Sequence, residues 1–207
     1  MDKTDRLRDY GLAFLLYEQG LGVCGYELIR ELFIFVKLIL NSYLASNFDN
    51  GINPVVSRDT GEKLVSEVSR RTLVEDYSYW NMPIAELFKQ KVDGNPGFDF
   101  HTVTPDGTLL MFGEAKYVAN TNAYNSAFNQ IPDFIKEGKD MKDLFEIRDF
   151  MPSPTPLDNA NNGIKGYVAA FSTNKTDDKD IISKVTGHKN YAQLSQYPQF
   201  IAIAVDL

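Results

Sequence analysis

The stretch that decides the fold is PGFDFHTVTPDGTLLMFGEAKYV, residues Pro96–Val118. Two runs within it, 98–104 and 108–118, are rich in aromatic and β-branched residues and each predict a strand. The Pro-Asp-Gly sequence at 105–107 has the composition of a tight turn between them. The second run carries apolar side chains on both of its faces, which is typical of a central strand that is covered on each side.

Two charged residues interrupt the second run. Glu114 and Lys116 are two positions apart, so on a strand their side chains share one face, and Asp99 lies on the neighbouring strand. Burying acids and a lysine in an apolar strand has no cheap structural motive. Two converging carboxylates can instead hold Mg²⁺ or Mn²⁺, with waters and a phosphate completing the coordination. The ion would activate a water, and the lysine would orient it and balance charge on the phosphate. We therefore predict phosphodiester hydrolysis, with Asp99, Glu114 and Lys116 as catalytic residues.

The register of the two strands decides whether these side chains meet. In a two-residue turn, Thr104 pairs with Gly107, and Asp99 then shares a face with Glu114. Pro-Asp-Gly also makes three-residue loops with a bulge, and that register moves Asp99 to the opposite face. The predicted site needs the first register or a compensating bulge, and the sequence leaves both open.

A helix is expected to begin near Asp59, with Glu62 in a capping-box position, and to run through residues 63–75. Glu67 and Glu75 project into or beside its apolar face. One interpretation is an internal ion pair between Glu67 and Arg71, which have i, i+4 spacing. The other is that Glu67 or Glu75 reaches the active site, since inward carboxylates are costly unless they are paired or bound to metal.

The rest of the chain predicts further helices and strands. Helices are expected at 122–137, 140–150 and 177–191, and buried strands at 166–172 and 200–207, with a Pro- and Asn-rich surface loop at 151–163. This order predicts an α/β protein with a mixed central sheet and helices on both faces. We assign it to residues 56–207.

Residues 1–55 are expected to form an N-terminal helical segment. Helical structure is predicted up to about residue 46, and its clearest part is Tyr26–Leu44, which is apolar nearly all the way round. Such a helix is buried on most sides, either in the core or against a partner. Charged residues break this stretch before it reaches the length of a membrane span, so no membrane is expected.

Composition limits the class of protein. The 207 residues, 43% of them apolar, can bury a sizeable core. The single cysteine, Cys24, excludes an internal disulfide framework and indicates a reducing compartment. No signal-peptide pattern is visible, so we expect a cytoplasmic protein. The two histidines, His101 and His188, are too far apart to predict a zinc site or a histidine triad. The net charge of −7 lacks the basic excess of a protein that binds DNA alone, so we expect a homo-oligomer or a larger partner that supplies DNA affinity.

At Gly97-Phe98-Asp99-Phe100 and Gly113-Glu114-Ala115-Lys116 the chain resembles the PD-(D/E)XK, or restriction endonuclease-like, nuclease superfamily. The resemblance covers about residues 60–207, although the proline precedes the aspartate by three residues. It implies a metal held by Asp99, Glu114 and the Ala115 carbonyl, with Lys116 at the attacking water. It also implies an added acid from the preceding helix, best matched by Glu67 and next by Glu75, and a glutamine on the following helix, matched by Gln130.

Three functional interpretations follow. The first is a Mg²⁺- or Mn²⁺-dependent endonuclease that acts on nucleic acid, with DNA as the expected substrate, as the cutting subunit of a restriction or phage-defence system. The second is an inactive nuclease fold that serves as a binding or scaffolding subunit. The third is an unrelated α/β enzyme in which Glu114 and Lys116 form only an internal ion pair. The intact Asp, Glu and Lys favour the first.

Overall fold

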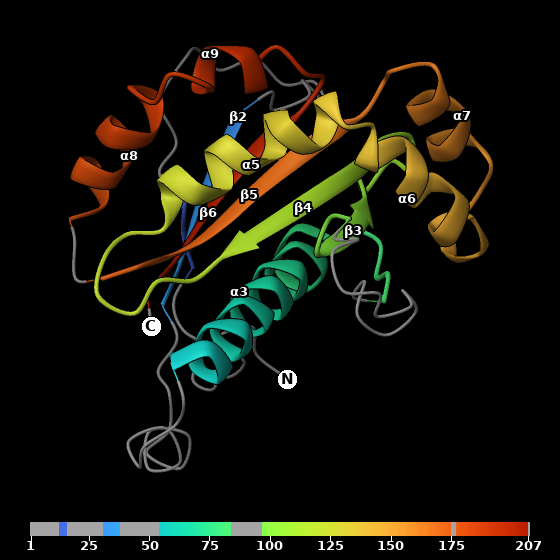
Figure 1. Ribbon diagram of the computed structural model, residues 1–207. Coiled ribbons are helices and arrows are strands. Elements are labelled where there is room, and N and C mark those ends of the chain that lie inside the picture. The colour runs from blue at the N-terminus through green and yellow to red at the C-terminus, as the bar shows by residue number, and fades with distance from the viewer. Residues whose placement is uncertain (1–12, 16–30, 38–53, 84–96, 175–176, 207) are drawn as a thin grey trace.

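The computed structural model describes residues 13–15, 31–37, 54–83, 97–174 and 177–206 (Figure 1). Six strands form one sheet: β1 (Ala13–Leu15), β2 (Glu31–Lys37), β3 (Phe100–Val103), β4 (Leu110–Lys116), β5 (Gly166–Thr173) and β6 (Phe200–Asp206). Their order across the sheet is β1-β2-β6-β5-β4-β3. The four inner strands run parallel, and the two edge strands are antiparallel to their neighbours. The predicted mixed sheet is confirmed.

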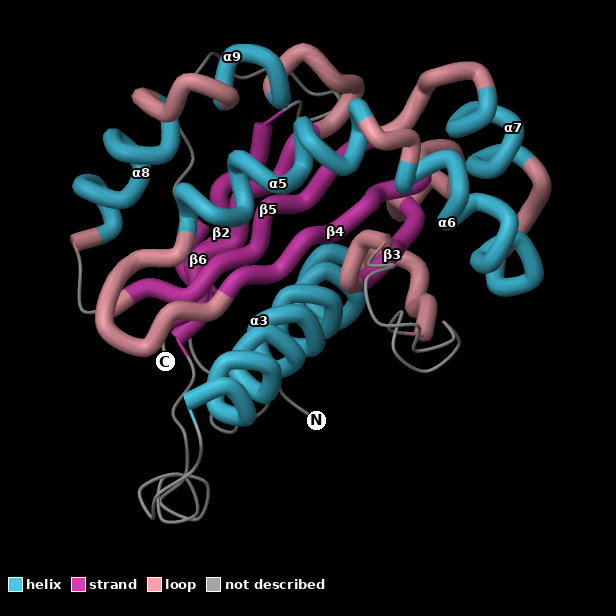
Figure 2. Tube along the Cα trace, viewed as in Figure 1, coloured by secondary structure: helices cyan, strands magenta, loops and turns pink. Residues whose placement is uncertain are grey.

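Helices cover both faces of this sheet, as predicted (Figure 2). The long helix α3 (Pro54–Tyr77) lies on one face. The other face carries α5 (Tyr124–Lys136), α6 (Lys139–Ile147), the short 3-10 turn Arg148–Phe150, α7 (Thr155–Asn161), α8 (Asp178–Thr186) and α9 (Tyr191–Leu194). None of the helices in the described part of the chain combines the length and the apolar content needed to cross a membrane.

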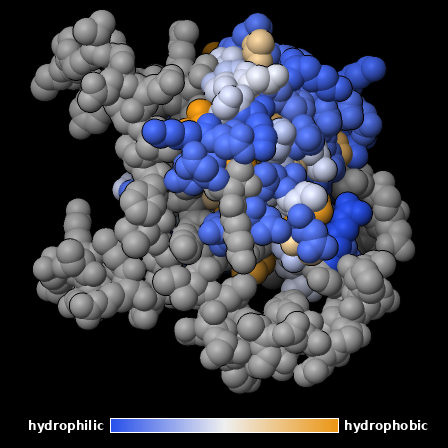
Figure 3. All heavy atoms as spheres, turned by 90° about the vertical axis from the view of Figure 1, so that its left-hand side faces the viewer, coloured by the Kyte–Doolittle hydropathy of each residue, from blue (hydrophilic) through white to orange (hydrophobic). Residues whose placement is uncertain are grey.

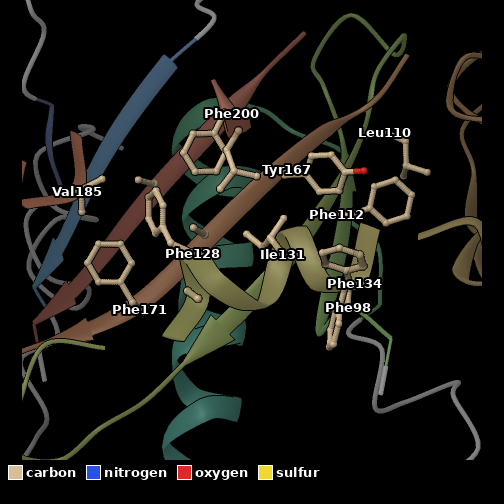
Figure 4. Packing of buried hydrophobic residues seen from close by; sticks show 14 of the residues in the cluster. Phe98, Leu110, Phe112, Phe128, Ile131, Phe134, Tyr167, Phe171, Val185 and Phe200 are labelled. Atoms are coloured by element: carbon tan, nitrogen blue, oxygen red, sulfur yellow. The ribbon is translucent and has the colours of Figure 1, made fainter. Parts of the chain in front are cut away.

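Each face of the sheet has its own hydrophobic cluster. Beneath α3 the cluster includes Val65 and Leu73 of the helix and Met111 of β4. On the α5 side, aromatic rings dominate, and Figure 4 shows Phe128 and Tyr167 among them. Because side chains alternate along a strand, β4 contributes Met111 to one cluster and Phe112 to the other. Apolar residues on both sides of β4 correctly predicted this double cover.

The helix predicted over Tyr26–Leu44 is wrong where the structure describes it. Glu31–Lys37 form strand β2, which pairs in parallel with β6 along its whole length, and Ala13–Leu15 form β1 rather than a helix. An apolar run without alternation fits a buried helix and an inner parallel strand equally well, and aromatic and β-branched residues favour the strand. The other residues before 54, Cys24 among them, lie outside the described ranges. Because residues 31–37 form a strand of the sheet, their apolar character is no longer a reason to expect a partner protein at this segment.

Two further boundaries differ from prediction. Helix α3 begins at Pro54 rather than near Asp59, and proline suits the first turn of a helix, where its missing N–H is not needed. Within the expected loop 151–163, residues Thr155–Asn161 form α7. The Asn159 side chain of α7 donates a hydrogen bond of 2.9 Å to the Thr108 carbonyl, so tertiary contact holds a helix that composition alone does not predict.

Helix α3 approaches β4 closely at a glycine. A Cβ atom at Gly61 would lie 2.2 Å from the Tyr117 ring, far inside van der Waals contact. The atoms closest to it belong to the part of the ring nearest the backbone of β4, so they have little room to move. Gly61 therefore sets the distance between α3 and β4, one residue before Glu62.

We expect Gly61→Ala to destabilise the fold by about 1–3 kcal/mol through overpacking, measured by urea unfolding. In a freely exposed helix the same change would instead stabilise by about 1 kcal/mol, so the sign of the effect is diagnostic. In a Tyr117→Ala background the clash is gone, and Gly61→Ala should become neutral or stabilising. Stabilisation in the parent protein would show that the helix and strand do not meet as described.

Candidate active site

The register of β3 and β4 brings the two predicted carboxylates together. Phe100 lies opposite Gly113, where the pairing ends, and the Asp99 N–H donates a 2.9 Å hydrogen bond to the same Gly113 carbonyl. The Asp99 carboxylate accepts from the N–H of Ala115, the residue after Glu114, at 2.7 Å, and its charge acts on Glu114. Neither of the two predicted registers is correct. The loop is longer than both, because the Thr104 N–H pairs with the Leu109 carbonyl. A shift of two residues from the two-residue turn leaves every side chain on the same face, so the required geometry is retained.

Asp106 explains the longer loop. Its carboxylate accepts hydrogen bonds from the Thr104 hydroxyl and from both the N–H and the hydroxyl of Thr108. These bonds lower the pKa of Asp106, although partial burial opposes them. An aspartate that bonds the backbone two residues onward is a familiar turn former, and here it closes a four-residue connection.

The site lies where the β3–β4 ladder ends. Strand β3 begins at Phe100, whereas β4 continues to Lys116. The Gly113 carbonyl points toward β3, and the alternation of backbone groups along a strand turns the N–H and carbonyl of Ala115 to the same side. There the Ala115 N–H donates to Asp99 Oδ2 at 2.7 Å. The Ala115 carbonyl thus lies on the β3 side of β4, as the Asp99 carboxylate does.

Glu114 and Lys116 form a buried ion pair. Lys116 Nζ lies 2.6 Å from Glu114 Oε1, and the two residues are 8% and 1% exposed. The second oxygen, Glu114 Oε2, is buried and has no hydrogen-bond partner among the described residues. A buried carboxylate oxygen without a partner is costly, so this atom is available for a ligand that supplies positive charge.

Burial and neighbouring charges shift the pKa of both members of this ion pair. Burial, and after it the charge of Asp99, raise the pKa of Glu114 well above 4.5, although Lys116 acts in the opposite direction. Burial disfavours the charged form of Lys116, but the nearby carboxylates of Glu114, Asp99 and Glu62 outweigh it and raise the pKa of Lys116. The lysine therefore stays protonated, with the carboxylates of Glu114, Asp99 and Glu62 acting on it.

The helix α3 contributes Glu62 to this cluster, and not the acids expected from the sequence. Glu62 Oε1 lies 3.8 Å from Lys116 Nζ and 3.3 Å from Arg58 Nε. The predicted pair between Glu67 and Arg71 is wrong. Arg70 binds Glu67 through both of its carboxylate oxygens, at 2.8 and 2.9 Å.

Glu75 is also engaged elsewhere, since it lies 2.8 Å from the Arg71 guanidinium. Because α3 starts five residues earlier than expected, Glu62 lies inside the helix rather than at its cap. Because Glu62 was interpreted as a capping residue, it was not predicted to be the acid of α3 that contacts Lys116. The only sequence signal for it was the small residue Gly61 beside it.

Gln130 lies on α5, the helix that covers the face of β4 to which Phe112 and Glu114 belong, and it is half-buried. Among the described residues it makes no hydrogen bond to Asp99, Glu114 or Lys116. The structure therefore places Gln130 on the helix that follows β4, as predicted, and shows no contact between its side chain and the site.

The donor set fits a magnesium-type ion. Asp99, Glu114 Oε2 and the Ala115 carbonyl are oxygen donors on one edge, and Mg²⁺ prefers a few such donors completed by waters. A divalent ion would also offset the repulsion between Asp99 and Glu114 that raises the pKa of Glu114. Within the described ranges, no group of three or more His, Cys, Asp or Glu side chains is arranged to hold a metal, so the proposed set depends on the backbone carbonyl.

Comparisons with known proteins neither add to this site nor argue against it. No family model matches the sequence, and neither the curated proteins nor the solved structures contain a significant match to it.

The raised pKa of Glu114 predicts a pH-dependent stability. Because the folded protein binds this proton more tightly than the unfolded chain does, the contribution of Glu114 is fully present below 4.5 and is lost as pH rises through the folded pKa. Glu114→Gln cannot ionise, so in EDTA its melting temperature should exceed that of the parent by a margin that grows with pH. In an Asp99→Asn background the growth should be smaller. A margin that stays flat or shrinks with rising pH would contradict the assignment.

Proposed function

We propose that this chain is a metal-dependent nuclease that hydrolyses phosphodiester bonds in DNA, with a site of the PD-(D/E)XK kind. The observation that carries the proposal is the meeting of Asp99 and Glu114 at the open end of the β3–β4 ladder, with Lys116 on the same edge. An ion pair that served stability alone would be expected to satisfy both oxygens of Glu114. Here Oε2 is buried without a partner in the described part of the chain.

Asp99, Glu114 and the Ala115 carbonyl would hold Mg²⁺ or Mn²⁺ in this site. When bound, the ion would polarise a phosphoryl oxygen and make a water more acidic. Lys116 carries the chain's own contribution to the chemistry. Because neighbouring carboxylates keep it protonated, it acts as a hydrogen-bond donor to the attacking water or to a phosphate oxygen, and not as a base. Glu62 orients its ammonium group.

The setting implied by the resemblance is the cutting subunit of a restriction or phage-defence system. The net charge of −7 is consistent with substrate delivery by a partner subunit or by a second copy of the chain, because phosphate neutralisation supplies most DNA affinity. On the side of the molecule that lies at the left of Figure 1, the described part of the surface is mostly hydrophilic (Figure 3).

Cleavage of supercoiled plasmid and of single-stranded DNA, with Mg²⁺, Mn²⁺ or EDTA, tests the proposal. We expect cutting with either metal and none in EDTA. Glu114→Gln should abolish it, and Lys116→Ala should lower the rate by about 100-fold or more, the usual loss when a charge-stabilising donor is removed. Glu62→Gln should cost about 10-fold as an outer partner of Lys116.

The matched control is Glu67→Gln, on the same helix but bound to Arg70, which should cut like the parent. Folding of each variant is checked by circular dichroism. Glu114→Gln or Lys116→Ala variants that cut as well as the parent would rule out the site. If the parent protein never cuts although it and its variants are folded, the inactive scaffolding alternative would be favoured.

Metal binding should also be visible without substrate. An ion that binds only the folded protein stabilises it by mass action, by about 2.7 kcal/mol at 100 times Kd. We expect Mn²⁺ to raise the melting temperature of the parent and to have no effect on Asp99→Asn. The effect should weaken at acidic pH, because Glu114 must release a proton to bind the ion. An equal rise in Asp99→Asn would place the metal elsewhere.

A further inference from the structure

Helix α6 carries two buried carboxylates that the site described above does not use. Asp140 and Asp143 are 1% and 3% exposed and are three residues apart, so both lie on the face of α6 that packs on the sheet. Buried carboxylates are costly unless hydrogen bonds or charges compensate them. The partners of each one therefore indicate what it does.

Asp143 holds the chain immediately around Asp99. Its Oδ2 accepts a 2.9 Å hydrogen bond from the Phe98 N–H, one residue before Asp99. The same oxygen lies 3.1 Å from Nε2 of His101, two residues after it. One carboxylate of α6 thus contacts β3 on both sides of a proposed metal ligand.

This contact occurs just outside the regular pairing of β3 with β4. The ladder ends with the bond from the Asp99 N–H to the Gly113 carbonyl, because β3 begins at Phe100. The Phe98 side chain is anchored in the core, with its ring centroid 5.4 Å from those of both Phe112 and Phe134 (Figure 4). Asp143 fixes the backbone N–H of the same residue, so both the side chain and the main chain before Asp99 are held.

We propose that Asp143, with His101 as its partner, is a positioning residue that fixes the Asp99 carboxylate opposite Glu114. This inference rests on the proposed function for its consequence, since metal ligands need placement to within about 0.5 Å by groups outside the ligand set. Loss of Asp143 frees the start of β3, and the Asp99 carboxylate then leaves the Ala115 N–H and the edge shared with Glu114.

The structure contains its own control in Asp140. This residue lies on the same helix and is equally buried, but it binds Lys165 Nζ at 2.5 Å and the Tyr167 hydroxyl at 2.8 Å, both on the β5 side. Removing Asp140 therefore disturbs α6 and leaves a buried lysine without its acid, yet it breaks no contact to the segment that carries Asp99. If Asp143 only helped α6 to pack on the sheet, removing Asp143 and removing Asp140 would have the same effects.

The experiment compares Asp143→Ala, Asp143→Asn and Asp140→Ala for Mn²⁺ affinity, urea stability and amide hydrogen exchange. We expect Asp143→Ala to weaken Mn²⁺ binding by about 10–100-fold, as is usual when an outer partner of a metal ligand is lost. Asp143→Asn should recover most of this, because its carbonyl oxygen can replace Oδ2, which accepts from the Phe98 N–H and faces His101 Nε2. Asp140→Ala should lose as much stability or more, and keep its Mn²⁺ affinity within about threefold, below the loss typical of an outer partner.

The exchange rate of the Ala115 amide separates this inference from the proposed function. That amide donates to the Asp99 carboxylate, so its protection reports the position of the carboxylate without any metal. Faster exchange in Asp143→Ala, but not in Asp140→Ala, supports the inference even if the parent binds no Mn²⁺, in which case only the proposed function fails. Equal effects of the two variants, or an unchanged Ala115 amide, would overturn it. If Asp143→Ala does not fold, Asp143→Ser is compared with Asp143→Asn by the same criteria.

Discussion

Two carboxylates come together where the β3–β4 ladder ends, and the charge of Asp99 acts on the buried Glu114. Asp99 and Glu114 repel across the strand pair, and burial makes the charge on Glu114 still less favourable. Lys116 lies 2.6 Å from Glu114 Oε1, and the charge of Glu62 acts on both residues. Gly61 lets α3 come close to Tyr117, and Glu62 contacts Lys116 from that helix.

The position of the site between two layers follows from the same ladder. Glu114 belongs to the α5 face of β4, whereas its lysine partner also contacts an acid of α3 on the other face. Lys116 is the last residue of β4 and lies beyond the pairing with β3, which ends at Gly113. The flexible four-carbon stem of lysine suits this position better than a rigid fork. One cation therefore connects the two helical layers at the point where the carboxylates meet.

Much of the α/β core could be predicted from local pattern. The strands around residues 100–103 and 110–116, the later strands and the helix over 124–136 all follow from side-chain periodicity and turn composition. The pairing of Asp99 with Glu114 could not be predicted, because it depends on a loop length set by three bonds to the Asp106 side chain. The identity of the third acid depended on where α3 begins, and helix boundaries are the least certain feature of a sequence pattern.

The error at the N-terminus has a different cause. The LFIFV run at 32–36 is apolar without alternation, so its own pattern does not distinguish an inner strand from a buried helix. Only its neighbour decides. It pairs with β6, itself an unbroken apolar strand, and a parallel pair of this kind joins residues far apart in the sequence. The sequence pattern also gives no sign of the contact made by Asp143, because 45 residues separate it from Phe98, whose N–H donates a hydrogen bond to its carboxylate.

The most direct measurement of the central claim is anomalous diffraction from crystals of the protein soaked in Mn²⁺. The account predicts one strong manganese peak at the edge of β4, within coordinating distance of Asp99, Glu114 Oε2 and the Ala115 carbonyl, with Lys116 beside it and not bound to it. The peak should be absent from crystals of Asp99→Asn treated in the same way. A parent crystal with no peak at this edge, or with its manganese bound by other residues while Glu114 stays paired only with Lys116, would contradict the account.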